Sequence, residues 1–291
     1  MPTDLTSAPY LSLAPSQYYQ PAPGLAGCVR VIVGRNTLGW ELEEKARLNY
    51  LPTLLTCCLT WVIEGAIQIK TKGHRRSVAR MVFSGPQTLP ATTVNVGSVH
   101  MMGLMLYPDA FHRMTGIYPG DLVNRTVPMQ EVLPKDWMEW AHAVMLSKTD
   151  ALRHECINEF LVKRWTASKD PHHKIGPSFQ DWVIRLEKFA TSTQSGRSQR
   201  QIERLVKRWT GQNLRGLQGV ARAEQAFFYA FQGLLRGDLS WREVALQSGF
   251  SDQSHLCRET RKFSGFSPDE IKNGMLNEEA FWIYRLWISA F

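Results

Sequence analysis

A ten-residue pattern that occurs twice near the C-terminal end constrains the fold of this chain more than any other feature. Residues 202–211 read Ile-Glu-Arg-Leu-Val-Lys-Arg-Trp-Thr-Gly, and residues 256–265 read Leu-Cys-Arg-Glu-Thr-Arg-Lys-Phe-Ser-Gly. Both copies place an arginine, two basic residues, an aromatic residue, a small hydroxyl residue and a glycine at the same positions. A Gln-Ser-Gly sequence precedes each copy, at residues 194–196 and 247–249. Such a repeat predicts two copies of one supersecondary unit.

The first copy has the periodicity of an amphipathic helix. Its apolar stripe consists of Ile202, Leu205, Val206 and Trp209. The opposite face carries Arg200, Arg204, Lys207 and Arg208. Surface helices usually mix charges of both signs, so a face of nearly one sign favours a polyanionic partner.

The second copy follows a helix and a turn that the sequence marks clearly. Residues 240–243 (Ser-Trp-Arg-Glu) have the form of a capping box, which begins a helix. Ala245 is small enough for a close helix crossing, and Gly249 suits the turn. Ser267 and Pro268 are expected to begin a further helix as its N-cap and first residue. Helix, glycine turn and basic helix form the helix-turn-helix arrangement, which reads the major groove of DNA.

Residues 241–258 and 261–268 closely resemble the signature of AraC/XylS-type transcription regulators. The first copy, together with residues 215–226, resembles the first helix-turn-helix and the connecting helix of that family. The resemblance covers residues 175–275. It implies a seven-helix DNA-binding domain whose two recognition helices enter successive major grooves of double-stranded DNA.

The resemblance also implies which side chains contact DNA. The base-contact positions are Gln199, Arg200, Glu203, Arg204, Gln253, Ser254, His255, Cys257 and Arg258. By the chemistry of their side chains, the candidates for phosphate contact are Arg197, Lys207, Arg208, Arg261 and Lys262. Arginine can pair with guanine and glutamine with adenine, whereas lysine and arginine on phosphate fix position without reading sequence.

This chain departs from the family pattern at several places. Residues 189–195, expected as the helix before the first turn, are poor in apolar residues, and Ser192 stands where the second unit has Ala245. Cys257 is an unusual contact residue. The first unit is therefore expected to dock less rigidly or to contribute mainly phosphate contacts.

The N-terminal half has the pattern of a β-rich domain. Strands are expected at residues 28–33, 54–63, 66–71, 80–84, 92–96 and 98–106, with a hairpin turn at Glu64 and Gly65. Cys57 and Cys58 should point to opposite faces of one strand. Helices are expected at residues 109–115, 137–146 and 152–165. The expected organisation is an arm at 1–24, a sensor or dimerisation domain at 25–166, a linker at 167–174, the DNA-binding domain at 175–275 and an aromatic tail at 276–291.

The N-terminal half also resembles, through residues 84–88 and 99–108, the cupin-like sensor domains of such regulators. The expected fold class is thus α+β: a small β-barrel with flanking helices, then an all-α double helix-turn-helix domain. Side chains that could line a barrel mouth and hold a small effector are Tyr50, Trp61, Phe83, His100 and Met102. The alternative for each of them is a place in the core, which is the favoured reading.

Composition and spacing argue against other classes of protein. The net charge is +8, which favours a polyanionic partner. Five cysteines without ligand spacing suggest reduced thiols in a cytoplasm, and no secretion signal is evident. Residues 54–63 are too few to span a membrane. His74, His100 and His112 are scattered, and no catalytic constellation is readable, so we expect neither a metal, nor a cofactor, nor an enzyme.

The sequence therefore predicts a sequence-specific, effector-responsive transcription regulator in the cytoplasm. Expected partners are DNA, a small-molecule effector, a second copy in a homodimer and, for an activator, RNA polymerase. Two alternatives remain: an N-terminal domain that only dimerises or binds a protein, and a disfavoured cupin-type enzyme fused to a DNA-binding domain. The tail is too apolar to extend into water, so it should pack on the body of the protein.

Overall fold

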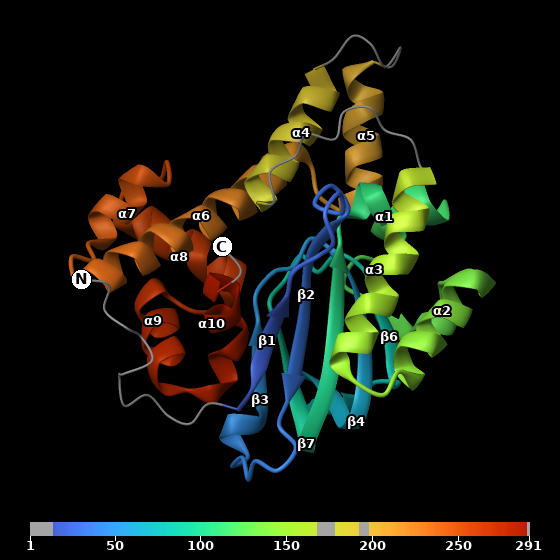
Figure 1. The fold of residues 1–291 in the computed structure, drawn as a ribbon. Helices are drawn as coiled ribbons and strands as arrows, with labels where there is room; N and C mark the ends of the chain where they lie inside the picture. The colour runs from blue at the N-terminus through green and yellow to red at the C-terminus, as the bar shows by residue number, and fades with distance from the viewer. Residues whose placement is uncertain (1–13, 168–177, 192–197, 290–291) are drawn as a thin grey trace.

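The computed structural model describes residues 14–167, 178–191 and 198–289. A curled antiparallel sheet forms the centre of the molecule, with helices α1–α3 on one side and α7–α10 on the other (Figure 1). Most of the expected linker lies outside the described residues. Within those residues, no helix is long and apolar enough to cross a bilayer.

The sheet has eight strands in the order β1-β2-β7-β4-β6-β8, while β3 pairs with β7 and β5 pairs with β4. The strands are β1 (Ser16–Tyr19), β2 (Val29–Asn36), β3 (Leu48–Leu51), β4 (Cys57–Thr71), β5 (His74–Ser77), β6 (Met81–Ser84), β7 (Ala91–Leu106) and β8 (Thr126–Pro128). The sheet curls without closing, so the expected barrel describes it only approximately. The expected arm at 1–24 is partly wrong, because residues 16–19 form a strand that pairs with β2.

The predicted hairpin at Glu64 and Gly65 is wrong, because β4 continues through it as one bent strand. Register shifts between Val62 and Ala66 mark β-bulges, which bend a strand without ending it. Gly65 has φ +79°, and a Cβ there would overlap the carbonyl oxygen of Ser98. Glycine suits this bend best, and residues on both sides of it, such as Thr60 and Ile67, line one cavity.

One face of the sheet packs against α1 (Pro108–Thr115), α2 (Lys135–Leu146) and α3 (Asp150–Ala167). The core between them includes Leu59, Trp61 and Leu104 of the sheet. Alternate residues point the other way, so the prediction for the cysteines is confirmed: Cys57 lies in this core and Cys58 on the opposite face.

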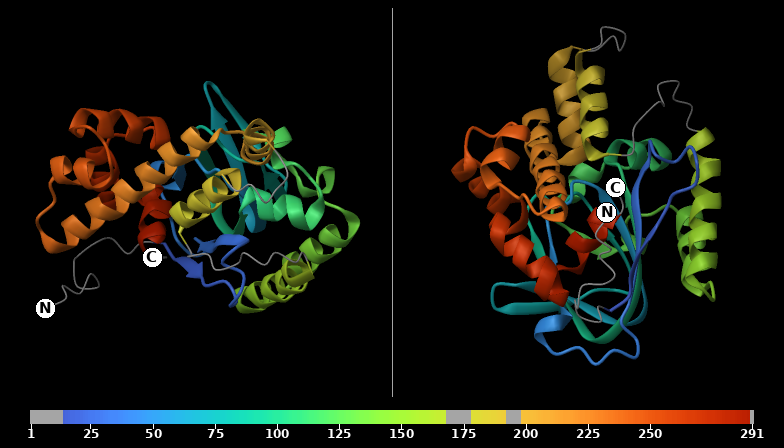
Figure 2. Two further views of the ribbon diagram at one scale, coloured as in Figure 1. Left: turned by 90° about the horizontal axis from the view of Figure 1, so that it is seen from above. Right: turned by 60° about the vertical axis from the view of Figure 1, so that its left-hand side comes forward.

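The C-terminal half is helical. Its elements are α4 (Phe179–Thr191), α5 (Gln199–Thr210), α6 (Leu214–Arg236), α7 (Trp241–Gln247), α8 (Gln253–Ser264), α9 (Pro268–Asn277), the 3-10 turn η5 (Glu279–Phe281) and α10 (Trp282–Ser289). The α4–α5 pair stands at one end of the long helix α6, and α7–α9 pack along the other (Figure 2).

Helices α4–α6 share a core with the sheet, while α6–α8 also enclose a smaller cluster of their own. Trp182, Leu186, Val206 and Leu217 from α4–α6 belong to the same buried cluster as the sheet residues that face α1–α3. Trp182 also stacks on Tyr107, with ring centroids 5.0 Å apart, and donates its indole N–H to Asp109 Oδ1 at 2.8 Å. The helical half is therefore docked on the sheet by specific contacts.

Candidate DNA-binding surface and effector cavity

The second unit has the predicted helix-turn-helix geometry. Ser240 caps α7, and its hydroxyl accepts a hydrogen bond from the Glu243 backbone N–H at 3.4 Å. Gly249 follows in the left-handed region, φ +74°, while the Phe250 N–H bonds back to the Ala245 carbonyl at 2.9 Å. Ala245 is fully buried in the contact between α7 and α8. The predicted roles of Ala245 and Gly249 are confirmed.

The repeat extends to the hydrogen bonds that end each recognition helix. The Thr210 hydroxyl donates to the Val206 carbonyl at 2.9 Å and accepts from the Gln212 N–H at 3.1 Å. In the second unit the Ser264 hydroxyl donates to the Thr260 carbonyl at 2.7 Å and accepts from the Phe266 N–H at 3.1 Å. These contacts explain the small hydroxyl residue before the final glycine of each copy.

The next helix begins at the same distance in both units. Asn213 caps α6 through its side-chain oxygen, and Ser267 caps α9 in a full capping box, with Pro268 at the first position as predicted. The equivalence of Asn213 and Ser267 was not read from the sequence. The repeated unit is thus the basic helix together with its turn and the cap that follows.

Most of the predicted DNA-contact residues lie on the outer faces of these helices. In α5 the exposed ones are Arg200, Glu203, Arg204, Lys207 and Arg208. In α8 they are Gln253, Ser254, Arg258, Arg261 and Lys262. His255 and Cys257 are half-buried. Arg197 and the side chain of Gln199 lie outside the described residues.

Three residues of the predicted inner stripe of α5 are buried and Leu205 is half-buried, but much of the stripe packs on the N-terminal half. Trp209 lies 6.1 Å from the His112 ring, and Arg208 stacks on Tyr118 at 3.5 Å. The 3-10 turn η2 (Pro119–Leu122) supports the end of α5. The helix expected over 189–195 is not described as a separate helix: residues 189–191 end α4 and 192–195 lie outside the described residues. Of the seven helices that the resemblance implies, the described residues show six, α4–α9.

The flank of α8 faces the N-terminal half across a groove of about 590 Å³. His255 and Lys262 line this groove together with Arg215 and Arg222 of α6. At its end the Thr53 N–H donates to the Phe263 carbonyl at 2.8 Å. Both recognition helices are therefore held by the sheet domain at their C-terminal ends.

Replacing Gly120 with alanine is expected to destabilise the docking of α5. A Cβ at this position would overlap the Arg208 carbonyl oxygen, which the helix backbone holds rigidly. Overpacking of this kind costs about 1–3 kcal/mol, which chemical denaturation can measure. Gly219→Ala in α6 is the matched control, because no atom lies within 4 Å of its Cβ. It should raise stability by about 0.5–1 kcal/mol; equal effects of the two variants would contradict close docking at η2.

A cavity of about 490 Å³ lies inside the curled sheet. It is bounded by the sheet face opposite α1–α3 and by Trp282 and Ile283 of α10. The tail therefore packs on the body of the protein, as predicted, and specifically against this cavity.

None of the five side chains proposed for the effector pocket lines this cavity. Trp61, Phe83 and Met102 are fully buried on the other face of the sheet, in the core with α1–α3. His100 pairs with Asp150 at 2.9 Å, and Tyr50 packs on Phe266 and Phe281 between the two halves. For these three residues the favoured alternative, a place in the core, is therefore confirmed. Their neighbours in sequence face the cavity, because side chains alternate along a strand.

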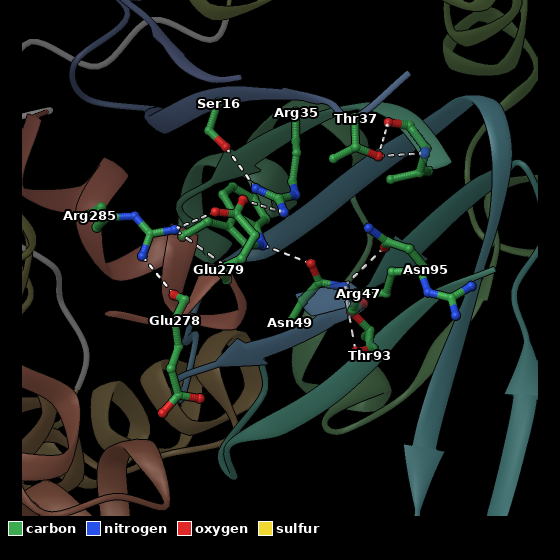
Figure 3. Close-up of polar contacts among 12 residues, drawn as sticks. Ser16, Arg35, Thr37, Arg47, Asn49, Thr93, Asn95, Glu278, Glu279 and Arg285 are labelled. Atoms are coloured by element: carbon green, nitrogen blue, oxygen red, sulfur yellow. Dashed lines mark hydrogen bonds and ion pairs between the residues drawn. The ribbon is translucent and has the colours of Figure 1, made fainter. Parts of the chain in front are cut away.

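Buried polar groups line the end of the cavity near α10 (Figure 3). The Asn49 amide donates to Asn95 Oδ1 at 3.0 Å and accepts from the Trp282 indole at 2.8 Å. Arg35 pairs with Glu279 at 2.8 Å and donates to Ser16 at 3.0 Å. Burial lowers the pKa of the Arg35 guanidinium, and the Glu279 carboxylate opposes that shift. Arg35 and Asn49 come from a central and a flanking strand, which sequence patterning alone did not single out.

A second buried ion pair joins the two halves of the molecule. Arg30 of β2 pairs with Glu224 of α6, and both side chains are almost completely buried. Burial raises the pKa of the Glu224 carboxyl, while Arg30 opposes the rise.

At the surface, Asp252 is the N-cap of α8. Its carboxylate accepts a hydrogen bond from the His255 backbone N–H, which lowers the pKa of the Asp252 carboxyl.

The scattered histidines serve different local contacts. His112 stacks on Tyr118 with centroids 3.9 Å apart, and His74 lies at the cavity rim on β5. Among the described residues, no group of three His, Cys, Asp or Glu side chains is arranged to hold a metal ion.

Comparison with known families matches residues 191–274 to a helix-turn-helix domain family (HTH_18) and residues 17–128 to a domain of unknown function (DUF6597). A search of curated proteins gave no match.

Similar solved structures include apo ToxT from Vibrio cholerae strain SCE256, a substituted variant, at 11% identity and a TM-score of 0.41, covering 85% of this chain and 97% of that chain. ToxT from Vibrio cholerae O395 has 10% identity and a TM-score of 0.37, and the match covers 79% of this chain and 93% of that chain. The AraC-like transcriptional activator CuxR has 10% identity and a TM-score of 0.27, and the match covers 94% of this chain and 91% of that chain. The family match over 191–274 falls on the repeated units described above, so these residues form a helix-turn-helix domain and the protein is a DNA-binding transcription regulator.

Proposed function

We propose that α5 and α8 enter two adjacent major-groove segments of one DNA duplex, and that a small effector in the sheet cavity changes their affinity for DNA. The observation that carries the first part is the similar construction of the two helices. Each has a largely buried inner stripe, exposed basic residues on the outer face, and a hydroxyl residue followed by glycine at its end. A plain helical hairpin would not need the basic face twice.

The exposed side chains divide into two expected roles. Arg200, Arg204, Gln253 and Arg258 suit base edges, since arginine and glutamine can form paired hydrogen bonds with guanine and adenine. Gln199, Glu203, Ser254, His255 and Cys257 complete the proposed base-contact set. The proposed phosphate contacts are Arg197, Lys207, Arg208, Arg261 and Lys262.

Replacing Arg258 with alanine is expected to weaken binding to the preferred site by about 1–3 kcal/mol and to relax the preference at one base pair. Lys207→Ala is the matched control in the other helix: it should weaken binding to all sequences alike and lower the salt slope by about one. Both side chains are exposed, so neither change should unfold the protein. Equal losses for Arg258→Ala on preferred and random DNA would contradict base reading by Arg258.

Selection from a randomised duplex library tests the two-helix proposal. We expect enrichment of two short sequence blocks about one helical turn apart. Enrichment of only one sequence block would mean that α5 contacts DNA phosphates without reading bases. Enrichment of no sequence, with and without cell extract as a source of effector, would contradict sequence-specific reading.

The cavity supports the effector part of the proposal over a domain that only dimerises or binds a protein. Its volume lies in the range of small-molecule sites, and it combines apolar walls with a few polar groups. A thermal-shift screen with metabolites tests this, because a ligand that binds only the folded state raises its stability. Homodimer formation, contact with RNA polymerase and a cytoplasmic location stay predictions, and we propose no catalytic activity.

A further inference from the structure

Two arginines and one histidine line the sheet cavity, namely Arg35, Arg76 and His74. Within the part of the chain that the structure describes, no aspartate or glutamate lines the cavity. The rest of the lining is mainly aliphatic, with hydroxyls such as those of Thr56 and Thr60. Such a lining suits a molecule with an apolar body and an anionic group.

Arg35 is the most deeply buried of these cations, at 2% exposure. Its guanidinium lies over the Trp282 ring at 4.7 Å, and one nitrogen donates to Ser16. Its Nη2 is 2.8 Å from Glu279 Oε1, but neither of these atoms has an aligned hydrogen bond, and Nε has none either. The bidentate capacity of this arginine is therefore only partly used.

Other unused hydrogen-bonding groups lie on the cavity wall. The Thr56 hydroxyl and the Asn95 amide nitrogen are each at least nine-tenths buried and have no hydrogen-bond partner. Unpartnered buried polar groups are costly, so natural structures rarely keep them without a ligand or water. These groups can all donate, which calls for an acceptor-rich ligand.

Glu279 comes from the other half of the molecule and sits between two arginines. Its Oε2 is 3.1 Å from Arg285, while Oε1 faces Arg35. Arg285 also donates to the carbonyls of Met275 and Glu278. One buried carboxylate thus lies against two buried guanidinium groups. The local net charge is positive, so this site can accommodate a second anion.

We propose that Arg35 is the anion subsite of the cavity, and that Glu279 fills it as an internal carboxylate until an apolar organic acid takes its place. This proposal rests on the effector role of the cavity and specifies the chemistry of the effector. The acid places its carboxylate on Arg35 and its apolar body along the aliphatic walls, and η5 and α10 lose one of their attachments to β2.

The segment that carries Glu279, η5 with α10, packs against the end of the second helix-turn-helix unit. Phe281 of η5 lies against Gly274 of α9 and 5.0 Å from the ring of Phe266. Phe266 directly follows the glycine that ends α8. An acid that binds better when Glu279 is displaced therefore shifts the position of α8, because a ligand favours the state for which it has the higher affinity.

Calorimetric titration of the full chain with decanoate and 2-naphthoate, each against its methyl ester, tests the subsite. We expect each acid to bind the wild-type protein about tenfold or more tightly than its ester, since only the carboxylate can form an ion pair with Arg35. Glu279→Gln should tighten acid binding several-fold and leave ester binding unchanged. Arg35→Gln should remove the preference for acid. Glu278→Gln is the matched control: its side chain faces Lys45 outside the cavity, so acid binding should not change.

If Glu279→Gln does not fold, Glu279→Asp withdraws the carboxylate by one methylene and should tighten acid binding in the same direction. Acid and ester binding alike to the wild-type protein would overturn the anion subsite while leaving an effector cavity in place. Absence of binding by all four probes, to wild type and variants alike, would overturn the subsite and the proposed cavity together. Weaker acid binding by Glu279→Gln would overturn the role of Glu279 as a competitor.

Discussion

Replacement of Arg30 with methionine is expected to lower the free energy of unfolding by about 3–5 kcal/mol at neutral pH. Methionine keeps much of the side-chain volume but leaves the Glu224 carboxylate buried without its cation. Both partners are almost completely removed from water. This pair joins β2 to α6, so the loss falls on the attachment of the DNA-binding half to the sheet.

The effect should depend on pH in a defined direction. Burial raises the pKa of Glu224 in the folded protein above its ordinary value of 4.5, and Arg30 opposes this rise. In the folded variant this pKa therefore rises further. A raised carboxyl pKa stabilises the fold below the unfolded pKa, and that stabilisation is lost as the pH rises through the folded pKa. The penalty for Arg30→Met should thus be smallest near pH 4.5 and grow towards neutral pH.

Urea unfolding of the single and double variants across this pH range measures the effect. Arg30→Met combined with Glu224→Gln should recover a large part of the lost stability and remove the added pH dependence, because no buried charge remains. A penalty below about 1 kcal/mol without pH dependence would show that the pair behaves as an exposed one.

Replacement of Trp282 with alanine is expected to cost about 3–5 kcal/mol. The indole is 5% exposed, donates to Asn49 and lies under the Arg35 guanidinium. Alanine leaves a void in the cavity wall, an unpartnered Asn49 oxygen and an arginine without its aromatic neighbour. The C-terminal segment should then separate from the sheet before the rest of the protein unfolds.

Trp282→Phe separates packing from hydrogen bonding at this position. Phenylalanine keeps an aromatic face for Arg35 but cannot donate, so its cost should be about 0.5–1.5 kcal/mol. Thermal and chemical unfolding, with hydrogen exchange of residues 279–289, measures both variants. Equal exchange of this segment in Trp282→Ala and wild type would contradict its anchoring through Trp282.

The helical half was largely predictable because its signals are local. Gly249 and Ser267 act through neighbours three to five residues away, and the stripe of α5 follows from the period of a single helix. The first helix-turn-helix is tested less fully, because residues 189–191 end α4 and residues 192–195 lie outside the described residues.

The candidate effector site was less predictable because strand patterning does not say which face of a sheet is hollow. Trp61 and Met102 are large and apolar, yet they fill the core under α1–α3, while Thr60 and Met101 face the cavity. The bend at Gly65 turns a run expected as a hairpin into one strand that wraps the cavity. Neither outcome follows from alternation alone.

The amino-acid sequence by itself determined the repeated helices, their caps and the basic character of their outer faces, because these depend on spacings within one turn or one short loop. Only the tertiary structure decided that the last aromatic helix closes the sheet cavity and that Arg30 and Arg35 meet Glu224 and Glu279. Those partners lie far along the chain, and a buried charge is neutralised by whichever opposite charge the folded chain brings beside it.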